Sequence, residues 1–506
     1  MAQICINDLT YGYEGSFDNV FENISFSIDT NWRLGFVGRN GKGKTTFLKL
    51  LLGKYEYAGS ISTNTRFDYF PYKLTGEQLD MTADELMEIW KPCVENWRVM
   101  CELPILGISA ELLYRPIRTL SFGERTKIML AVLFSCENDF LLIDEPTNYL
   151  DSGARETIKK YLASKKGFIL VSHDRDLLDG CIDHVLAINR STIEVQTGNF
   201  SSWWKNKENA DNYAKIENAK HLREIAKLKM AADRASRWAD ANENSKIGFD
   251  KSKDPDRANN ARSYIGTKTK KMQSRVKSYE NRIVREIEQK KGLLSDIEKD
   301  IELKIMPLSH YKKRLVECKN LSIQYEGGDF VIKNMTFELN QGERIFLNGE
   351  NGCGKSSLIK AILKTNSNKE FTGFFIEGEV NVASNMVISY ISQDTSHLKG
   401  TLKKYAEIQN LDYSLFLALL RQLDFDRNQF VKDIENFSEG QKKKVLIAES
   451  LLTPAHLYIW DEPLNHIDVF SRIQIEKLID VYKPTMLIVE HDVRFRENLA
   501  TKIIDM

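Results

Sequence analysis

Two glycine-rich stretches have residue types that suit phosphate binding. "GRNGKGKTT" starts at residue 38 and "GENGCGKSS" at residue 349, each between a strand-like run and an apolar helical run. Both fit G-x-x-x-x-G-K-[S/T], through Gly38, Gly43, Lys44 and Thr45, and through Gly349, Gly354, Lys355 and Ser356. In this pattern the glycines let backbone N–H groups and a helix N-terminus close around phosphate, the lysine reaches the β and γ oxygens, and the hydroxyl binds Mg²⁺.

Two D-E-P strings supply carboxylates at matching places. They are "LLIDEPTNYLD" at 141–151 and "YIWDEPLNHID" at 458–468. Asp144 and Asp461 end apolar runs and suit the Mg²⁺ shell. Glu145 and Glu462, which follow them, can orient or deprotonate the water that attacks a γ-phosphate.

Two histidines and two serine-glycine pairs complete the set. His173 and His491 each follow an apolar strand by two residues, and the carboxyl ends of parallel strands form a nucleotide crevice. We therefore expect both imidazoles to reach the γ-phosphate. "LSFGER" and "FSEGQK" each precede an apolar helix and would place a hydroxyl and backbone N–H groups at an anion site; their key residues are Ser121, Gly123, Ser438 and Gly440.

The elements that position these residues form a duplication. The glycine-rich stretch, the D-E-P string and the histidine each return about 311 to 318 residues later. Each copy opens with alternating sequence typical of antiparallel strands, and continues with wholly apolar runs such as "DFLLID" and "TMLIVEHD", typical of buried parallel strands. We predict an α/β fold with two tandem nucleotide-binding domains, residues 1–203 and 313–506, joined by a helical linker at 204–312.

The linker reads as an antiparallel α-helical coiled coil. Apolar residues recur at helical intervals over about 205–244 and 263–304, and ~40 residues at 1.5 Å each reach ~60 Å, more than is needed to join two neighbouring domains. We interpret it as a reaching arm whose tip is at 244–262. The tip residues Lys246, Ile247, Phe249 and Lys251 suit ribosomal RNA, where cations meet phosphate and a ring can stack. A solvated flexible hairpin is the alternative.

Composition narrows the setting. The whole chain of 506 residues has zero formal net charge, but residues 205–304 hold 25 Lys and Arg against 17 Asp and Glu, which favours a polyanion or a solvated helical face. The seven cysteines form no C-x-x-C pair, so we expect a reducing compartment and no zinc. The sequence shows no leader and no long apolar window. We expect a cytoplasmic protein with no membrane span.

Taken together, the paired motifs resemble the ABC-F family, soluble tandem ATP-binding-cassette proteins of the translation machinery, over nearly the whole chain. The resemblance implies ATP and Mg²⁺ as ligands and a head-to-tail closure, in which Ser438 and Gly440 complete the site of Lys44 while Ser121 and Gly123 complete that of Lys355. It also assigns ATP-binding roles to Tyr13 and Tyr325 (adenine stacking), Asp151 and Asp468 (D-loop), Gln393 (Q-loop, also near Mg²⁺), and Asn40, Gly41, Thr46, Asn351, Gly352 and Ser357 in the glycine-rich stretches.

The sequence departs from the family pattern in a few places. Tyr72 stands where the first Q-loop glutamine is expected. Phe122 and Glu124 replace a glycine and the glutamine of the first signature, and Glu439 replaces a glycine of the second. We expect the two sites to hydrolyse ATP at different rates.

Within ABC-F proteins, the long linker resembles that of the antibiotic-resistance members of the Lsa and Vga group, as does the end of the sequence 15 residues after His491. This implies ribosome protection: binding at the exit site, with the large-subunit RNA and the P-site tRNA as partners, and displacement of lincosamide, pleuromutilin and streptogramin A drugs. We expect a monomer away from the ribosome and no stable DNA partner. Three alternatives remain: a housekeeping factor that tunes elongation, the ATPase subunit of a drug exporter, and a chromosome-type or DNA-repair ATPase, whose coiled coil would lie inside a cassette.

Overall fold

The computed structural model describes residues 3–14, 19–92, 94–136, 139–189, 192–244, 274, 277–279, 281–285, 304–326, 328–367, 373–425 and 429–506. The chain divides into one unit made of Met1–Trp203 with Ile301–Met506, and a second unit, Trp204–Asp300. Within the larger unit we call the part up to Trp203 the first copy and the part from Ile301 the second copy.

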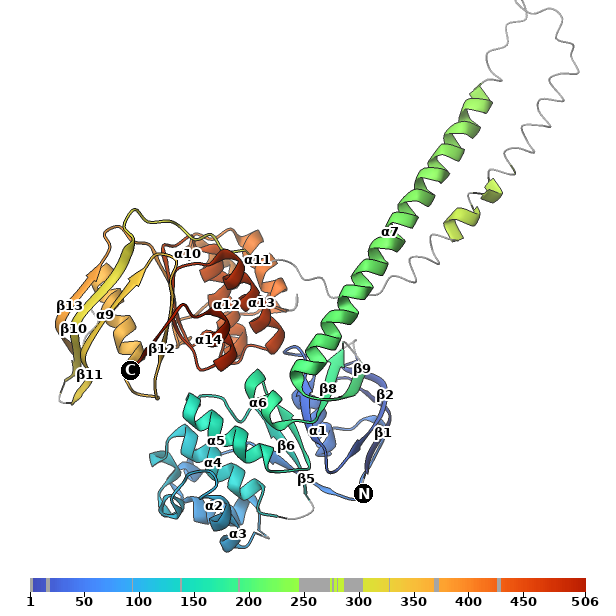
Figure 1. Cartoon of the computed structure of the whole chain (residues 1–506). Helices are drawn as coiled ribbons and strands as arrows, with labels where there is room; N and C mark the ends of the chain where they lie inside the picture. Colours follow the sequence, from blue (N-terminus) through green and yellow to red (C-terminus); the bar gives the residue numbers. More distant parts are fainter. Residues whose placement is uncertain are drawn as a thin grey trace, which may run out of the picture. The chain divides into compact units, whose positions relative to one another are not determined.

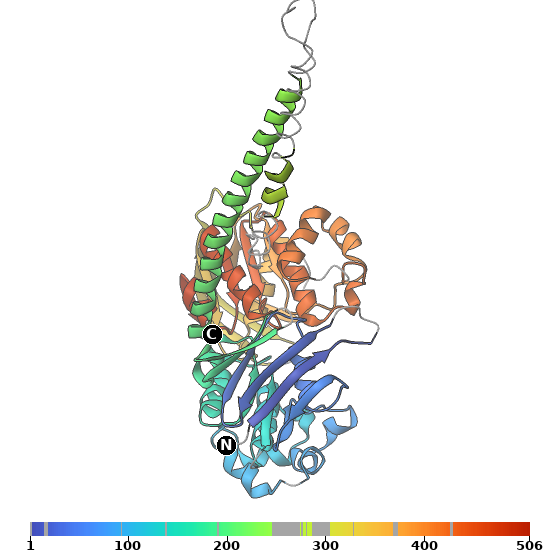
Figure 2. The ribbon, with the colours of Figure 1, turned by 90° about the vertical axis from the view of Figure 1, so that its right-hand side faces the viewer.

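Each copy begins with an antiparallel sheet, as the alternating sequence predicts. In the first copy the order is β2-β1-β4, with β1 at Gln3–Tyr11, β2 at Phe21–Asp29 and β4 at Ala58–Ser62. The dark blue strands in Figure 2 are β1 and β2. In the second copy the order is β11-β10-β13, with β10 at Arg314–Tyr325, β11 at Phe330–Asn340 and β13 at Phe374–Val382.

The second sheet of each copy carries the wholly apolar strands. The first copy has the order β5-β6-β7-β3-β8-β9, parallel except for the antiparallel β8–β9 pair; the strands are β3 (Arg33–Val37), β5 (Arg66–Phe70), β6 (Asp139–Asp144), β7 (Phe168–Val171), β8 (His184–Asn189) and β9 (Thr192–Thr197). The second copy has the all-parallel order β14-β15-β16-β12-β17; the strands are β12 (Arg344–Asn348), β14 (Ile388–Ile391), β15 (Leu457–Asp461), β16 (Met486–Val489) and β17 (Lys502–Asp505). The predicted α/β class with a largely parallel core sheet is confirmed.

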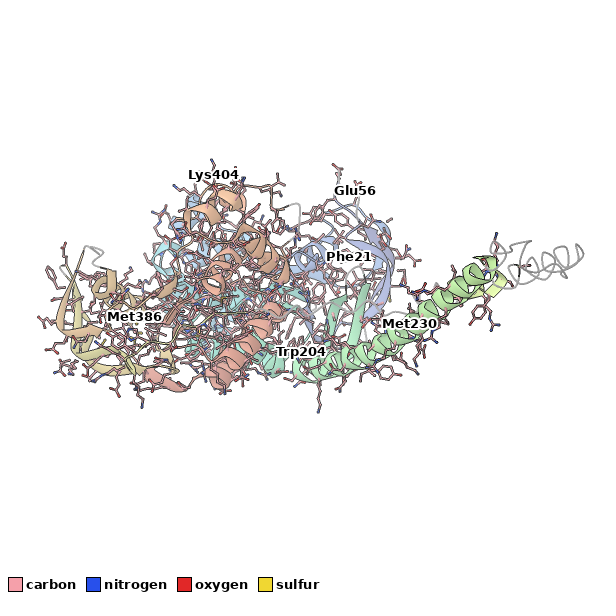
Figure 3. The ribbon with its side chains drawn as sticks, turned by 90° about the horizontal axis from the view of Figure 1, so that it is seen from above. Phe21, Glu56, Trp204, Met230, Met386 and Lys404 are labelled. Carbon is pink, nitrogen blue, oxygen red and sulfur yellow. The ribbon has the colours of Figure 1, made fainter. Side chains whose placement is uncertain are left out.

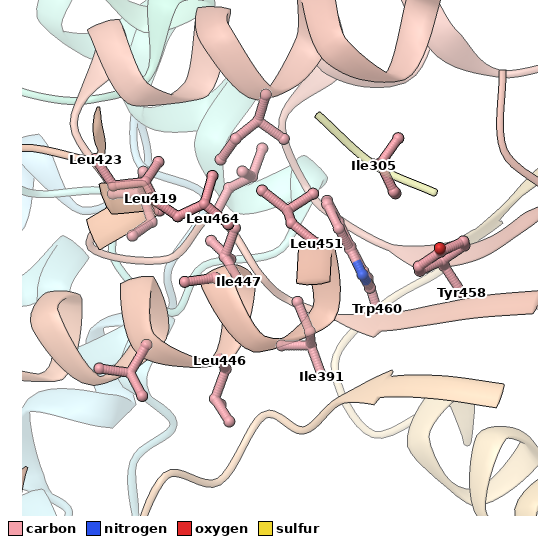
Figure 4. Packing of buried hydrophobic residues seen from close by; sticks show 14 of the residues in the cluster. Ile305, Ile391, Leu419, Leu423, Leu446, Ile447, Leu451, Tyr458, Trp460 and Leu464 are labelled. Carbon is pink, nitrogen blue, oxygen red and sulfur yellow. The ribbon is translucent and has the colours of Figure 1, made fainter. Parts of the chain in front are cut away.

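Helices follow the strands in the same sequence in both copies. Those of the first copy are α1 (Lys44–Leu51), α2 (Ala83–Trp90), α3 (Asn96–Glu102), α4 (Phe122–Leu133), α5 (Ser152–Ala163) and α6 (Arg175–Cys181). Those of the second are α9 (Lys355–Ser367), α10 (Leu402–Ile408), α11 (Tyr413–Gln422), α12 (Glu439–Leu452), α13 (Val469–Tyr482) and α14 (Val493–Leu499). Apolar side chains between helices and sheet form the core: Figure 4 shows Trp460 of β15 beside Leu451 of α12. This packing fixes the strand ends, where the candidate site lies.

One long helix, α7, spans Phe200–Asn244 and is the green helix of Figure 1. The helix predicted from about residue 205 is therefore present and begins earlier, because the Asn199 side chain accepts a hydrogen bond from the Ser202 backbone N–H (3.0 Å) and caps it. Ile225 is buried, whereas Met230, labelled in Figure 3, is exposed.

The rest of the arm is tested only at a few positions. Residues 277–279 and 281–285 are helical, as predicted for the second helix, and Ile283 is buried. The tip residues Lys246, Ile247, Phe249 and Lys251 and most of 263–304 lie outside the described residues. The coiled coil thus stays a prediction. Among the described residues no helix has both the length and the apolar character needed to cross a membrane.

Candidate functional site

The two glycine-rich turns sit directly before α1 and α9, as predicted. Gly43 has φ 94°, and a Cβ placed on it would lie 2.6 Å from Val20 Cγ1. Gly354 has φ 102°, and its Cβ would lie 2.8 Å from Ile332 Cγ1. Only glycine meets both the left-handed conformation and the close approach. The sequence thereby fixes a tight backbone turn at each helix N-terminus, which is where phosphate binds.

Each turn holds a lysine ammonium at its centre. Lys44 Nζ donates to the carbonyl oxygens of Gly38 (2.6 Å) and Arg39 (3.1 Å). Lys355 Nζ donates to those of Gly349 and Glu350, at 2.8 Å each. Burial lowers the pKa of Lys44, against the effect of nearby carboxylates such as Asp468. A cation held among the backbone groups of a turn can bind a phosphate oxygen there.

A hydroxyl and a carboxylate meet beside the first turn. Thr45 Oγ1 donates to Asp144 Oδ2 at 2.9 Å, and the Tyr69 hydroxyl donates to the same oxygen at 3.0 Å. Burial raises the pKa of Asp144, while the hydrogen bonds from Thr45 and Tyr69 lower it. Sequence reasoning missed Tyr69, although its place one residue before the end of β5 put it beside the end of β6.

The second copy repeats this pair. Asp461 is buried at the end of β15, and its Oδ1 has no hydrogen-bond partner in the described part of the protein. Burial raises the pKa of Asp461, which the Ser356 hydroxyl opposes. One hydroxyl and one carboxylate suit Mg²⁺, which keeps several waters and phosphate oxygens as ligands. The described residues contain no cluster of three or more His, Cys, Asp and Glu side chains that could hold a metal.

Glu145 and His173 form the candidate base of the first copy. Glu145 has φ 52°, and His173 Nε2 lies 3.3 Å from Glu145 Oε1. Burial, followed by the charge of Asp144, raises the pKa of Glu145 to about 8. Burial also lowers the pKa of His173 well below its ordinary value, so the imidazole is neutral at pH 7. With a pKa of about 8 the Glu145 carboxyl holds its proton at pH 7, and a magnesium nucleotide beside it would favour the charged form, which accepts a proton from water.

The corresponding carboxylate of the second copy is held more firmly. Glu462 Oε2 accepts hydrogen bonds from Gln393 Nε2 (2.9 Å) and Asn465 Nδ2 (2.7 Å). His491 Nε2 lies 3.8 Å from Glu462 Oε1, and burial lowers the pKa of His491 to about 3. In the first copy Tyr72 stacks on Trp90 (ring centroids 5.0 Å) and donates to Asp68 instead, so it does not take the place of Gln393.

A cavity of about 380 Å³ joins these groups of the first copy to the second copy. The first copy contributes Asn40, Gly41, Lys44, Thr45, Asp144, Glu145, Val171 and His173, and the second Asp424, Gln429, Ser438, Glu439, Gly440, Gln441, Lys444 and His466. Ser438 caps α12 and accepts from Gln441 N. The structure thus brings the predicted pair Ser438 and Gly440 to the site of Lys44.

A second cavity, of about 530 Å³, is also lined by residues of both copies. The second copy contributes Tyr325, Val331, Asn351, Gly352, Gly354, Lys355, Ser356, Ser357, Gln393, Glu462, Asn465 and His491, and the first Phe122, Tyr149 and Arg155. Phe122, between Ser121 and Gly123, lines it, and the role of Ser121 and Gly123 at this site stays a prediction. Ser121 and Glu124 close a capping box on α4, as Ser438 and Gln441 do on α12, and the Phe122 ring is exposed.

Direct contacts between the copies join the two cavities. Asn40 Nδ2 donates to the His466 carbonyl (3.0 Å), and Asn351 Nδ2 donates to the Tyr149 carbonyl (3.1 Å). The His466 Nε2 and Tyr149 hydroxyl are hydrogen-bonded at 2.8 Å. The sequence did not single out Tyr149 or His466 as functional residues, although they occupy the same place in the two D-E-P strings.

The remaining predicted residues lie nearby with structural partners. The hydroxyls of Tyr13 and Thr46 are 2.6 Å apart, and those of Tyr325 and Ser357 are 2.7 Å apart. Tyr325 lines the cavity of Lys355. Asp151 and Asp468 cap α5 and α13. Asp468 also forms a buried ion pair with Lys444 at 3.2 Å.

These groups fit a magnesium nucleotide. The turns and lysines would hold the phosphates, and Thr45 with Asp144 and Ser356 with Asp461 would hold the metal. Among the described residues, Asp461 Oδ1 is buried without a hydrogen-bond partner, so it can bind a cation or a water. The roles of these groups in catalysis remain predictions.

The chain is similar to known ATP-binding proteins over nearly its whole length. The sequence model described as ABC transporter matches residues 21–148 and 332–465. The chain is 27% identical to the ribosome protection protein VmlR of Bacillus subtilis (96% of this chain, 83% of that protein) and 28% to the ATP-binding protein Uup of Buchnera aphidicola (96% and 78%). These relatives confirm the resemblance to ABC-F proteins.

Solved structures share the fold at low identity. The archaeal ribosome recycling factor aABCE1, solved in complex with the archaeal ribosomal stalk protein aP1, has a TM-score of 0.61 at 19% identity, over 98% of this chain and 87% of that one. The RNase-L Inhibitor has a TM-score of 0.59 at 18% identity, over 99% and 87%. At these identities the likeness shows two tandem ABC ATPase domains and nothing finer.

Proposed function

The chain belongs to the ABC transporter family of ATPases, and from this premise we propose that it is an ATP-dependent ribosome protection protein. Its domains are of the kind that bind ATP, generally with Mg²⁺, and hydrolyse it. In the proposal it binds the ribosomal exit site and dislodges lincosamide, pleuromutilin and streptogramin A drugs from the peptidyl-transferase centre through the tip of its linker. Hydrolysis then releases it.

The observation that carries the proposal is the pairing of two composite cavities with a long helix between the copies. Each cavity takes its turn and lysine from one copy and closing residues from the other. ATP bound in either cavity would therefore hold the two copies together. The helix α7 follows the first copy directly, so closure can act on the linker.

The side chains support a simple division of labour. Lys44 and Lys355 bind phosphate oxygens, and Thr45 and Ser356 bind the metal with Asp144 and Asp461. The bound nucleotide with Mg²⁺ supplies an activated γ-phosphoryl group. Glu145 and Glu462 accept the proton of the attacking water, and His173 and His491, neutral at pH 7, orient it.

Two observations support the ribosome as the partner: a relative's function and the charge of the linker. VmlR, which covers 96% of this chain in the alignment, is a ribosome protection protein. The linker is basic, with 25 Lys and Arg against 17 Asp and Glu over 205–304, as phosphate binding requires. In the proposal the arm contacts large-subunit RNA and the P-site tRNA.

Hydrolysis-deficient variants test the cycle. Glu145→Gln with Glu462→Gln keeps the size of both side chains and removes both carboxylates. In ATP this double variant should stay on ribosomes through sedimentation, whereas the parent chain cycles off. A matched control adds Lys44→Ala and Lys355→Ala, which should prevent trapping by removing the phosphate contacts. Release of the double variant at the parent's rate would rule the cycle out.

A further inference from the structure

A row of three side chains leads from the nucleotide site of the first copy to the start of α7. Arg39, in the glycine-rich turn, places its guanidinium over the ring of Phe470 in the second copy, 5.4 Å from the centroid. On the same ring, the Trp203 indole packs edge-on at 6.3 Å and 84°. Trp203 is the fourth residue of α7. All three residues belong to the larger unit.

Each end of this row is fixed. Arg39 also forms an ion pair with Asp424, which lines the cavity of Lys44. Phe470 is the second residue of α13, two positions after Asp468, whose ion pair with Lys444 reaches the same cavity. Trp203 and Phe470 are both buried. The row therefore runs from the wall of a nucleotide site to the root of a helix.

The root of α7 is held by both copies. Ser201 N and Oγ donate to the Asp179 carboxylate of α6 (2.7 and 2.6 Å), which belongs to the first copy. Arg494 of α14, in the second copy, donates to Ser201 Oγ (2.9 Å) and pairs with Asp179. A movement of one copy against the other must therefore move the root or break these contacts.

The duplication supplies an internal comparison. Glu350 stands in the second turn where Arg39 stands in the first, and Gly153 stands in α5 where Phe470 stands in α13. A Cβ at Gly153 would meet Asp151 Oδ1 at 3.8 Å, an ordinary contact, so local packing does not demand glycine there. The arginine–ring pair thus exists at the site beside the α7 root and has no counterpart at the other.

We propose that Phe470 is a positioning residue that couples nucleotide in the Lys44 site to the root of α7, through Arg39 on one side and Trp203 on the other. The proposal rests on the ATPase sites and deepens the proposed function, because it names the route by which ATP would set the arm. Since α7 is one continuous helix of 45 residues, a reorientation of its root extends along its length.

Hydrogen exchange of the full chain tests this without ribosomes. In the Glu145→Gln, Glu462→Gln background, saturating ATP should slow exchange of the amides at 200–206 about tenfold, as expected when a cation–ring–ring row tightens. Phe470→Leu should abolish that effect while ATP still protects the turn at 38–46. Phe470→Tyr, which keeps the ring, should restore it.

Two outcomes would overturn the coupling: protection at 200–206 that does not respond to ATP in the background chain, or the same ATP response in Phe470→Leu. Phe470→Leu could also lose ATP protection at 38–46. Trp203→Leu then tests the coupling, because it leaves the second copy intact and should lose only the ATP response at 200–206. If ATP still protects residues 200–206 but the chain does not bind ribosomes, the proposed function is wrong and the coupling through Phe470 still holds.

Discussion

At the residue scale, the chemistry of the first copy is concentrated in four side chains of the cavity beside the first glycine-rich turn. Lys44, Asp144, Glu145 and His173 meet in one cavity, as the motif series implied. The sequence alone did not predict that Tyr69 donates to Asp144. Which face of the sheet a strand tyrosine occupies depends on the register with β6, and that register is not visible in the sequence. The sequence shows that Tyr72 departs from the family pattern. It does not show that the Tyr72 ring stacks on Trp90, because that contact depends on how the two elements pack.

Hydrolysis at each site should depend on its own glutamate. Glu145→Gln and Glu462→Gln should each lower the turnover number for ATP, by about 10²-fold or more at the site concerned, because each removes a proton acceptor. Binding of ATP should persist, since neither residue belongs to the glycine-rich turns. Single-turnover hydrolysis with one site blocked at a time measures this, and an unchanged rate in both variants would contradict the assignment.

The buried Asp468–Lys444 pair makes a pH-dependent contribution to stability. Burial alone would raise the pKa of Asp468, but Lys444 and the Ser471 N–H outweigh it and lower that pKa below the ordinary 3.8. A depressed folded-state pKa means that the contribution is present above pH 3.8 and is lost as pH falls through the folded value.

Asp468→Asn should therefore destabilise the protein by about 3–5 kcal/mol at pH 7, because it leaves Lys444 buried without a counter-charge. The difference from the parent chain should shrink as the pH falls below 4. Asp412→Asn, at the exposed cap of α11, serves as the control and should change little. Denaturant titrations at several pH values measure both. A constant difference across pH would argue against the ion pair as the cause.

At the element scale, local sequence was sufficient where one element defines the geometry. The strands, the helices that follow the glycine-rich turns and the long α7 all appear as predicted. The expected approach of Ser121 and Gly123 to the Lys355 site stays a prediction; Phe122, which stands between them, lines the cavity there. A signature string cannot show which of its residues faces another domain.

The turn before α1 should tolerate no side chain. Gly43→Ala must adopt φ near 94° and also displaces Val20, 2.6 Å from the added Cβ. Gly342→Ala, at φ 85° with nothing within 4 Å, bears the backbone strain alone and is the matched control. We expect about 1–2 kcal/mol for the control and more for Gly43→Ala, with ATP binding lost only in the latter. Equal losses in thermal stability and ATP binding would contradict this account.

At the scale of the whole molecule, the sequence predicted that the copies complete each other's sites but not how they touch. The bond between Tyr149 and His466, and the two asparagine contacts beside it, join residues more than 200 positions apart. Such contacts depend on how two folded domains meet, which no local pattern encodes. The arm's tip lies outside the described residues, so its target stays a prediction.

The contact between the copies should matter for ATP affinity. Tyr149→Phe removes one hydroxyl and its bond to His466. A hydrogen bond contributes about 0.5–1.5 kcal/mol, so the ATP concentration for half-maximal hydrolysis should rise about two- to tenfold. Tyr311→Phe, which removes a hydroxyl bonded to Ser384 elsewhere, should leave it unchanged. Equal values for Tyr149→Phe and the parent chain would show that this bond does not support closure.

The central claim is that the arm's tip protects ribosomes from drugs. The most direct test is the drug susceptibility of a sensitive bacterium that expresses either the intact chain or a version with residues 244–256 shortened. The account predicts that the intact chain confers resistance to peptidyl-transferase drugs, and that the shortened chain does not although it still hydrolyses ATP and binds ribosomes. Absence of resistance from the intact chain to every such drug would contradict the account and favour a housekeeping translation factor.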